Sequence, residues 1–180
     1  LVPAGDWSGT AQITVTVTDN GTVPLSDTET YTMTVNPVND APVLTEIGNQ
    51  ATDEDIPLTG LTVVFSDADA TDSYVITVTS NEANLTVANL NGTTSGSSYD
   101  LVPAADWSGT AQITVTVTDN GTGALSDTET YTLTVNAVND APTFTSPAET
   151  AATQGSLYTY NISTEDMDGD AIDVTGTTVP

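Results

Sequence analysis

Apolar and polar positions alternate along much of the chain with a period of two. From Ile113 to Val117 every second residue is apolar and the residues between are threonine, and residues 131–135 repeat this pattern. In an extended chain such alternation sends the apolar side chains to one face and the threonines to the other. Two β-strands are therefore predicted here, joined by a turn at Thr118-Asp119-Asn120-Gly121.

Shorter runs of the same type predict further strands upstream. They lie at residues 43–47, 61–65, 74–79, 84–87 and 97–102. About seven short strands in roughly a hundred residues is typical of an immunoglobulin-like sandwich, and no stretch has a convincing helical period. The predicted fold class is all-β, an immunoglobulin-like β-sandwich.

A long internal repeat organises the chain. Residues 1–40 and 101–140 are nearly identical, which gives a period of 100 residues. The two copies differ only at Gly5/Ala105, Val23/Gly123, Pro24/Ala124, Met33/Leu133 and Pro37/Ala137. Each copy runs into the same Val-Asn-Asp-Ala-Pro motif, at residues 38–42 and 138–142, which we call the N-terminal and C-terminal seams.

A period of this length suits a whole domain better than a solenoid unit. We therefore expect the C-terminal part of a preceding repeat at residues 1–40, a complete repeat at 41–140, and the N-terminal part of a following, divergent repeat at 141–180. Two explanations of the incomplete outer repeats stay open. The sequence is a window of a longer tandem array, or the outer parts complement each other between chains.

Charge narrows the possible functions. The chain has 25 acidic residues, no Lys, Arg, His or Cys, and a formal charge of −25. This composition argues against nucleic-acid binding and against attraction to anionic membranes. It also removes the common general bases, thiol nucleophiles and transition-metal ligands. No apolar run is long enough to insert into a bilayer. We expect a protein that is not an enzyme.

The same charge creates a need for a cation. Carboxylates at this density repel one another and oppose compaction, and no side chain of the chain can neutralise them. The neutralising cation must therefore come from solution. Because calcium prefers carboxylate, amide and carbonyl oxygens, Ca²⁺ is the predicted bound ion.

Three motifs resemble a known family. The Val-Asn-Asp-Ala-Pro seams, the Ser-Asp-Ala-Asp-Ala stretch at residues 66–70 and residues 115–121 resemble cadherin-like and bacterial immunoglobulin-like tandem repeats of large secreted surface adhesins. From Ala141 onward the sequence resembles a different subfamily, the dystroglycan-type cadherin-like domains. With the 100-residue period, the resemblance implies an all-β chain of tandem immunoglobulin/cadherin-like Greek-key β-sandwiches of about 100 residues each. It also implies non-catalytic, often calcium-dependent spacers or adhesive modules, placed extracellularly on a prokaryotic cell surface.

Sandwich topology places acidic loops at both seams. The loop at residues 66–72 and the turn after residue 118 are expected at the end of the sandwich where the linker arrives. The candidate calcium ligands there are Asn39, Asp40, Asp67, Asp69 and Asp119, with Asp6 as an additional one. At the C-terminal seam the candidates are Glu54, Asp106, Asn139, Asp140, Asp166 and Asp168.

The resemblance supports several of these ligands. Asp67 and Asp69 match the Asp-x-Asp ligands of cadherins, Asn39-Asp40 the linker ligands and Glu54 an early glutamate, whereas Asp106 stands where cadherins have a different acidic motif. Asp and Asn also occur in turns for local hydrogen bonding alone. A second group is expected to be solvated surface charge: Asp53, Asp55, Asp72 and Asp127.

Together these features predict a non-catalytic, calcium-rigidified stalk or spacer of a large surface adhesin or extracellular fibre. Its expected partners are neighbouring repeats of the same chain. Two alternatives remain: a self-assembling fibre subunit joined to other copies by complementation of half-domains, and an adhesive module that binds surface glycans or proteins.

Overall fold

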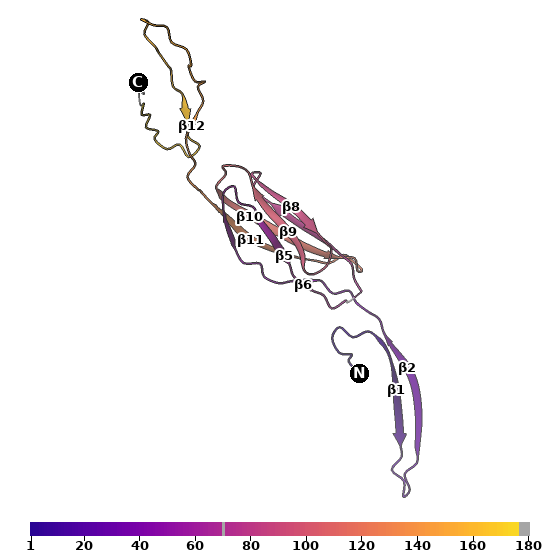
Figure 1. Ribbon diagram of the computed structural model, residues 1–180. Coiled ribbons are helices and arrows are strands. Elements are labelled where there is room, and N and C mark those ends of the chain that lie inside the picture. The colour runs from indigo at the N-terminus through magenta and orange to yellow at the C-terminus, as the bar shows by residue number, and fades with distance from the viewer. Residues whose placement is uncertain (70, 177–180) are drawn as a thin grey trace.

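The computed structural model describes residues 1–69 and 71–176. They form a hairpin, a sandwich and a short C-terminal segment, which follow one another along a line (Figure 1). The last residues of the predicted following repeat, 177–180, lie outside the described part. Every regular element of the described residues is a strand, and no helix among them could cross a membrane.

Within the described residues, the sandwich is built from nine strands. They are β3 (Val43–Leu44), β4 (Gln50–Asp53), β5 (Leu58–Val63), β6 (Phe65–Ser66), β7 (Tyr74–Ser80), β8 (Leu85–Asn91), β9 (Ser97–Pro103), β10 (Gly109–Asp119) and β11 (Ser126–Asn136). One sheet has the order β4-β11-β10-β7 and the other β5-β9-β8, with β3 and β6 as a separate pair. The prediction of an all-β sandwich is confirmed.

The first predicted strand, residues 43–47, differs from the structure. The chain forms β3, which pairs antiparallel with β6, and then β4, which pairs parallel with β11 at the other sheet. β4 was not predicted, because Gln50–Asp53 has no alternation of apolar side chains. Its strand conformation comes from hydrogen bonds to residues more than eighty positions away, from Gln50 opposite Leu133 to Asp53 opposite Asn136.

The core follows the alternation of β10 and β11. The side chains of Ile113, Val115 and Val117 are fully buried, and the threonines between them lie on the outer face. The core also holds two tyrosines, Tyr99 and Tyr131, whose hydroxyl oxygens are 2.6 Å apart. Their mutual hydrogen bond satisfies the polar atom that each ring carries into the apolar interior.

The N-terminal hairpin has the same pairing as β10 and β11 but lacks the covering sheet. Strands β1 (Gly9–Thr18) and β2 (Ser26–Val35) pair with a register identical to that of β10 and β11 after adding 100. Their apolar face is open, so Val17 is 65% exposed whereas Val117 is 0% exposed. At the other end, β12 (Thr143–Phe144) and β13 (Thr164–Glu165) repeat the β3–β6 pair.

This contrast predicts the effect of a paired substitution. Val117→Ala removes buried methyl groups and should lower the free energy of unfolding of the sandwich by about 2 kcal/mol. Val17→Ala in the hairpin should change it by less than about 0.5 kcal/mol, because the side chain is exposed. Urea unfolding of the two variants measures the difference, and equal losses would contradict the described burial.

Candidate metal centres

At the N-terminal seam, the linker is hydrogen-bonded to two acidic loops of the sandwich. The backbone N–H of Asp40 donates to Asp69 Oδ2 at 2.7 Å. The side-chain amide of Asn39 donates to Asp119 Oδ2 at 3.1 Å. The linker therefore lies against the loop after β6 and the turn after β10, as the topology predicted.

Local hydrogen bonds fix both acidic loops. Asp67 Oδ1 accepts the N–H of Asp69 at 2.9 Å, which closes a short Asx turn. Asp119 ends β10 and its Oδ1 accepts the N–H groups of Gly121 and Leu125, at 3.0 and 3.1 Å. Asp119 is only 3% exposed, so a carboxylate is held in the interior at the end of the sandwich.

Gly121 allows the Asn39 side chain of the linker to approach the turn closely. A Cβ atom at this position would overlap the side-chain amide of Asn39. At the equivalent Gly21 of the free hairpin, the nearest atom that a Cβ would meet is Asp19 Oδ1 at 3.3 Å. The sequence repeat thus carries a glycine whose role appears only where a linker packs on the turn.

Three carboxylates meet behind this linker. Asp67, Asp72 and Asp119 each offer an oxygen, and these oxygens lie within 4.8 Å of one another. Asp67 Oδ2 and Asp72 Oδ2 are buried and accept no hydrogen bond within the described chain. The expectation that Asp72 is solvated surface charge was wrong. Burial raises the pKa of Asp72, and the charges of Asp69, Asp119 and Asp67 raise it further.

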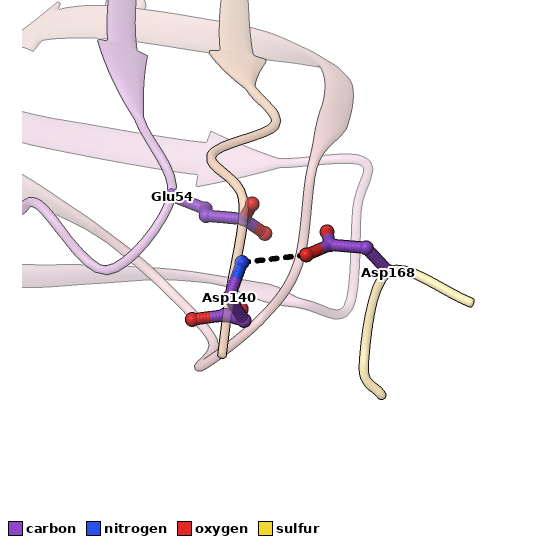
Figure 2. A group of neighbouring side chains, drawn as sticks. All are labelled: Glu54, Asp140 and Asp168. Carbon is purple, nitrogen blue, oxygen red and sulfur yellow. Dashed lines mark hydrogen bonds between the residues drawn. The ribbon is translucent and has the colours of Figure 1, made fainter. Parts of the chain in front are cut away.

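The C-terminal seam holds a second group, drawn from both sides of the linker. Oxygens of Glu54, Asp140 and Asp168 lie within 4.8 Å of one another. The N–H of Asp140 donates to Asp168 Oδ2 at 2.6 Å, and Glu54, which is 5% exposed, accepts from the N–H of Val138. Figure 2 shows the side chains of Glu54 and Asp168 extending toward Asp140 from opposite directions, with the hydrogen bond between Asp140 and Asp168 as a dashed line.

A third group shares Asp140 with the second. Asp55, Asp106 and Asp140 also offer oxygens within 4.8 Å of one another, and the N–H of Asp106 donates to Asp55 Oδ1 at 3.1 Å. Asp55 is exposed, as expected of a solvated surface charge, although one of its oxygens lies beside those of Asp106 and Asp140. Burial raises the pKa of Asp140, and the charges of Asp106, Asp168, Asp55 and Glu54 add to this.

The two seams repeat one arrangement. Asp140 donates to Asp168 as Asp40 donates to Asp69, and Asp166 accepts from Asp168 as Asp67 accepts from Asp69. The charge of Asp6 raises the pKa of Asp40, as the charge of Asp106 raises the pKa of Asp140. Burial is the largest cause of the raised pKa of Asp40, and the charges of Asp69 and Asp67 add to it.

Not every predicted calcium ligand lies in one of the three clusters of carboxylates. Asp40 and Asp69 hydrogen-bond to each other beside the group of Asp67, Asp72 and Asp119. Asn139 donates to the Asp140 carbonyl instead of a neighbouring loop, at 3.0 Å. Asp166 accepts the N–H groups of Asp168 and Asp170, both at 3.1 Å, and stays outside the group at Asp140.

The other two expected surface charges have structural contacts. Asp127 Oδ2 accepts the N–H of Leu44 at 2.8 Å, and Asp53 Oδ1 accepts from the Asn136 amide at 3.0 Å. Asp127 pairs with Val117, so it lies on the core-facing side of β11. The core-facing position of Asp127 in the alternation of residues 126–136 was the signal that could have predicted this contact. For Asp72 and Asp55 the sequence has no comparable signal, because loop geometry brings them to their groups.

Comparison with known proteins gives one family and many cadherin structures. The family model described as Bacterial Ig domain matches residues 39–136, more than half of the chain. The chain is similar to protocadherin gammaB7 EC3-6, with 29% identity and a TM-score of 0.51, over 77% of this chain and 36% of that one. It is also similar to protocadherin gamma B2 extracellular cadherin domains 3-6, with 25% identity and a TM-score of 0.52, over 77% and 35%.

Human CDH23 EC21-23 shares the fold at 19% identity and a TM-score of 0.51, over 88% of this chain and 58% of that chain. No curated protein sequence matches the chain. The chain spans 36% and 35% of the two protocadherin chains. These findings confirm the predicted immunoglobulin/cadherin-like sandwich. The family match ends before Ala141, so the subfamily proposed for the last residues stays a prediction.

The packing of Asn39 on Gly121 predicts a seam-specific defect. Gly121→Ala should displace Asn39 from Asp119 and leave the linker free to move, because the added methyl overlaps the Asn39 amide. Gly21→Ala, in the same Thr-Asp-Asn-Gly-Thr sequence, should leave the seam intact. Amide hydrogen exchange of residues 38–42 measures this: faster exchange in Gly121→Ala only is expected, and no change would contradict the docked linker.

The raised pKa values of Asp40, Asp72 and Asp140 predict the pH dependence of the cation-free protein. A carboxyl whose folded-state pKa is raised binds its proton more tightly when folded, so stability falls as the pH rises through that pKa. Acidification from pH 7 towards about 4 should therefore raise the melting temperature in chelator. Below that range the gain should reverse, since the pKa values of Asp19 and Asp100 are lowered by hydrogen bonds. A melting temperature that falls steadily from pH 7 would contradict this.

Proposed function

The chain belongs to the bacterial Ig domain family over residues 39–136, and on this basis we propose that it is a non-catalytic extracellular structural repeat. In this proposal it serves as a calcium-stiffened stalk or spacer of a large surface adhesin or fibre. The observation that carries the proposal is the repetition at both seams of the same linker hydrogen bond beside carboxylates without counter-charge.

The proposed domain organisation follows the repeat period. Residues 41–140 are one repeat, residues 1–40 the C-terminal part of the repeat before it, and residues 141–180 the N-terminal part of the one after it. The hairpin β1–β2 supports this, because its register equals that of β10–β11. The solved structure of protocadherin gamma B2 likewise contains extracellular cadherin domains in series.

Calcium fits the donor sets of both seams. Every group consists of carboxylate oxygens, and the chain has no His or Cys that would favour a transition metal. The buried oxygens of Asp67 and Asp72 accept no hydrogen bond within the described chain, which leaves lone pairs available to a cation. A bound Ca²⁺ would supply positive charge where no side chain can.

The proposed ligands extend the set predicted from the sequence. At the N-terminal seam they are Asn39, Asp40, Asp67, Asp69 and Asp119, to which the structure adds Asp72. At the C-terminal seam they are Glu54, Asp106, Asn139, Asp140, Asp166 and Asp168, to which the structure adds Asp55. Calcium takes about six to eight oxygens, so backbone carbonyls and water would complete each site.

Stiffness follows from which segments provide the oxygens. Glu54 and Asp106 belong to the sandwich, Asp140 to the linker, and Asp168 to the following segment. Without a cation their charges push these parts away from each other. A cation held by all of them would fix the linker, and its binding free energy would add to the stability of the folded chain. Extracellular calcium modules bind at about 10⁻⁴ to 10⁻³ M, so such a seam would be filled outside cells.

Calcium should therefore lengthen and stabilise residues 1–180. At a calcium concentration ten times the dissociation constant, binding adds about 1.4 kcal/mol, which raises the melting temperature by roughly 5–10 °C. Small-angle scattering should show a longer, less flexible particle in millimolar calcium than in chelator, with magnesium much less effective. If chelation changes neither the particle length nor the melting temperature, the calcium-stiffened stalk is contradicted.

The repeat provides a matched pair of variants for the same titration. Asp119→Asn should raise the calcium concentration at half-saturation by at least about tenfold, since it removes one of three clustered carboxylates. Asp19→Asn should leave this midpoint unchanged, although Asp19 accepts the same turn hydrogen bonds from Gly21 and Leu25. Equal shifts in both variants would mean that turn stability, and not a metal site, determines the response.

A further inference from the structure

The sheet edges of the sandwich are protected very unequally. In the described part of residues 41–140, β5 has a bulge between Leu58 and Leu61, and β8 has a register shift between Ala88 and Asn91. The edge strand β4 is only four residues long. Bulges and short strands are common devices that keep sheet edges from pairing with other chains. Three of the edges thus carry such a device.

The fourth edge, β7, carries none. It pairs with β10 without interruption over seven residues, from Tyr74 opposite Asp119 to Ser80 opposite Ile113, and it ends its sheet. Its sequence, Tyr-Val-Ile-Thr-Val-Thr-Ser, has no proline, no glycine and no charge, although the chain carries 25 acidic residues. Segments of six or seven residues with this composition pair readily with other strands. The free side of β7 is a regular, uncharged template for another strand.

We propose that the free edge of β7 binds the β7 edge of a second copy of this chain, antiparallel, as a symmetric dimer. The strand is self-complementary about Thr77. With Thr77 opposite itself, Ile76 lies opposite Val78 and Val75 lies opposite Thr79. Residues of like environment then meet, because Ile76 and Val78 are buried whereas Val75 and the two threonines are exposed. This is the isologous contact expected of a two-fold dimer.

A second copy suits this edge better than a charged partner. Two copies repel each other through their carboxylates, so they can approach only where both are uncharged, and β7 offers such a strand on each. The outer face already contains cross-strand threonine pairs, such as Thr116 and Thr128, with hydroxyl oxygens 3.0 Å apart. Thr77 opposite Thr77 would extend this row, and Val75, now 62% exposed, would gain a cross-strand neighbour.

The symmetry determines the orientation of the two chains. In Figure 1 the strands of the sandwich run along the line that joins the N-terminal and C-terminal segments. Antiparallel pairing of β7 therefore places the two chains side by side and pointing in opposite directions. This contact is lateral and does not involve the seams, so it is independent of the proposed calcium-stiffened function.

Sedimentation analysis of residues 1–180 over a range of concentrations tests the dimer. The wild-type chain should dimerise, more strongly at higher ionic strength because salt screens the carboxylates. Thr77→Lys should weaken dimerisation on the order of tenfold, since two ammonium groups would face each other across the two-fold axis. Thr130→Lys makes the same substitution on the outer face of β11, two strands from the edge, and should dimerise like the wild type.

Cross-linking tests the register. The chain has no cysteine, so single-cysteine variants report one contact each. Residues opposite each other on antiparallel strands have Cα atoms about 4.5–5.5 Å apart, within the range of a disulfide. Thr77→Cys should therefore form a disulfide-linked dimer on mild oxidation. Thr79→Cys should not, because four residues of offset separate its two copies by roughly 13 Å.

Three results would overturn the proposal. The first is a wild-type chain that stays monomeric at all concentrations. The second is a dimer that Thr77→Lys and Thr130→Lys weaken equally, with both variants melting like the wild type. The third is a dimer lost in Thr16→Lys but kept in Thr77→Lys, because the contact would then belong to the open hairpin edge of β1. Running each measurement in calcium and in chelator separates these outcomes from those of the seam titration.

Discussion

Repulsion between uncompensated carboxylates is the constraint around which this chain is arranged. A chain with 25 acidic residues and no basic residue has no side chain of opposite charge that could neutralise its carboxylates. The fold moves most of them to turns and seams, and it satisfies several with backbone N–H groups, as at Asp67, Asp119 and Asp166. The other carboxylates are concentrated at the seams, where consecutive segments meet. There the repulsion is strongest, and a cation would have the greatest effect on shape.

The two copies of the hairpin show which features the local sequence determines and which depend on tertiary packing. Residues 1–40 and 101–140 form the same strands and the same outer threonine pairs, whether or not a second sheet covers them. Strand conformation and register are therefore largely local properties of this sequence. Burial of Val117, docking of Asn39 on Gly121 and enclosure of Asp119 all need the rest of the sandwich, so the same residues acquire new roles there.

This distinction explains how far the sequence could predict the structure. The long strands β10 and β11 were predictable because alternation is written in their own residues, and the seams because the Asn-Asp-Ala-Pro motif recurs at a fixed spacing. β4 was not, since its conformation depends on pairing with β11 more than eighty residues later. Asp72 was misread as solvated because loop geometry alone brings it to its group. The contact of Asp127 with Leu44 was missed because its place on the inner face of β11 was overlooked.

The parallel pairing of β4 with β11 also bears on how the chain carries tension. The chain leads from the N-terminal seam through β3 into β4, and from β11 into the C-terminal seam. A pull on the two seams draws these neighbouring strands in opposite directions along their length. Their hydrogen bonds, from Gln50 opposite Leu133 to Asp53 opposite Asn136, are then loaded in shear and share the force. They cannot open one at a time, as they would in a hairpin peeled from its end, and so this short strand acts as a mechanical clamp.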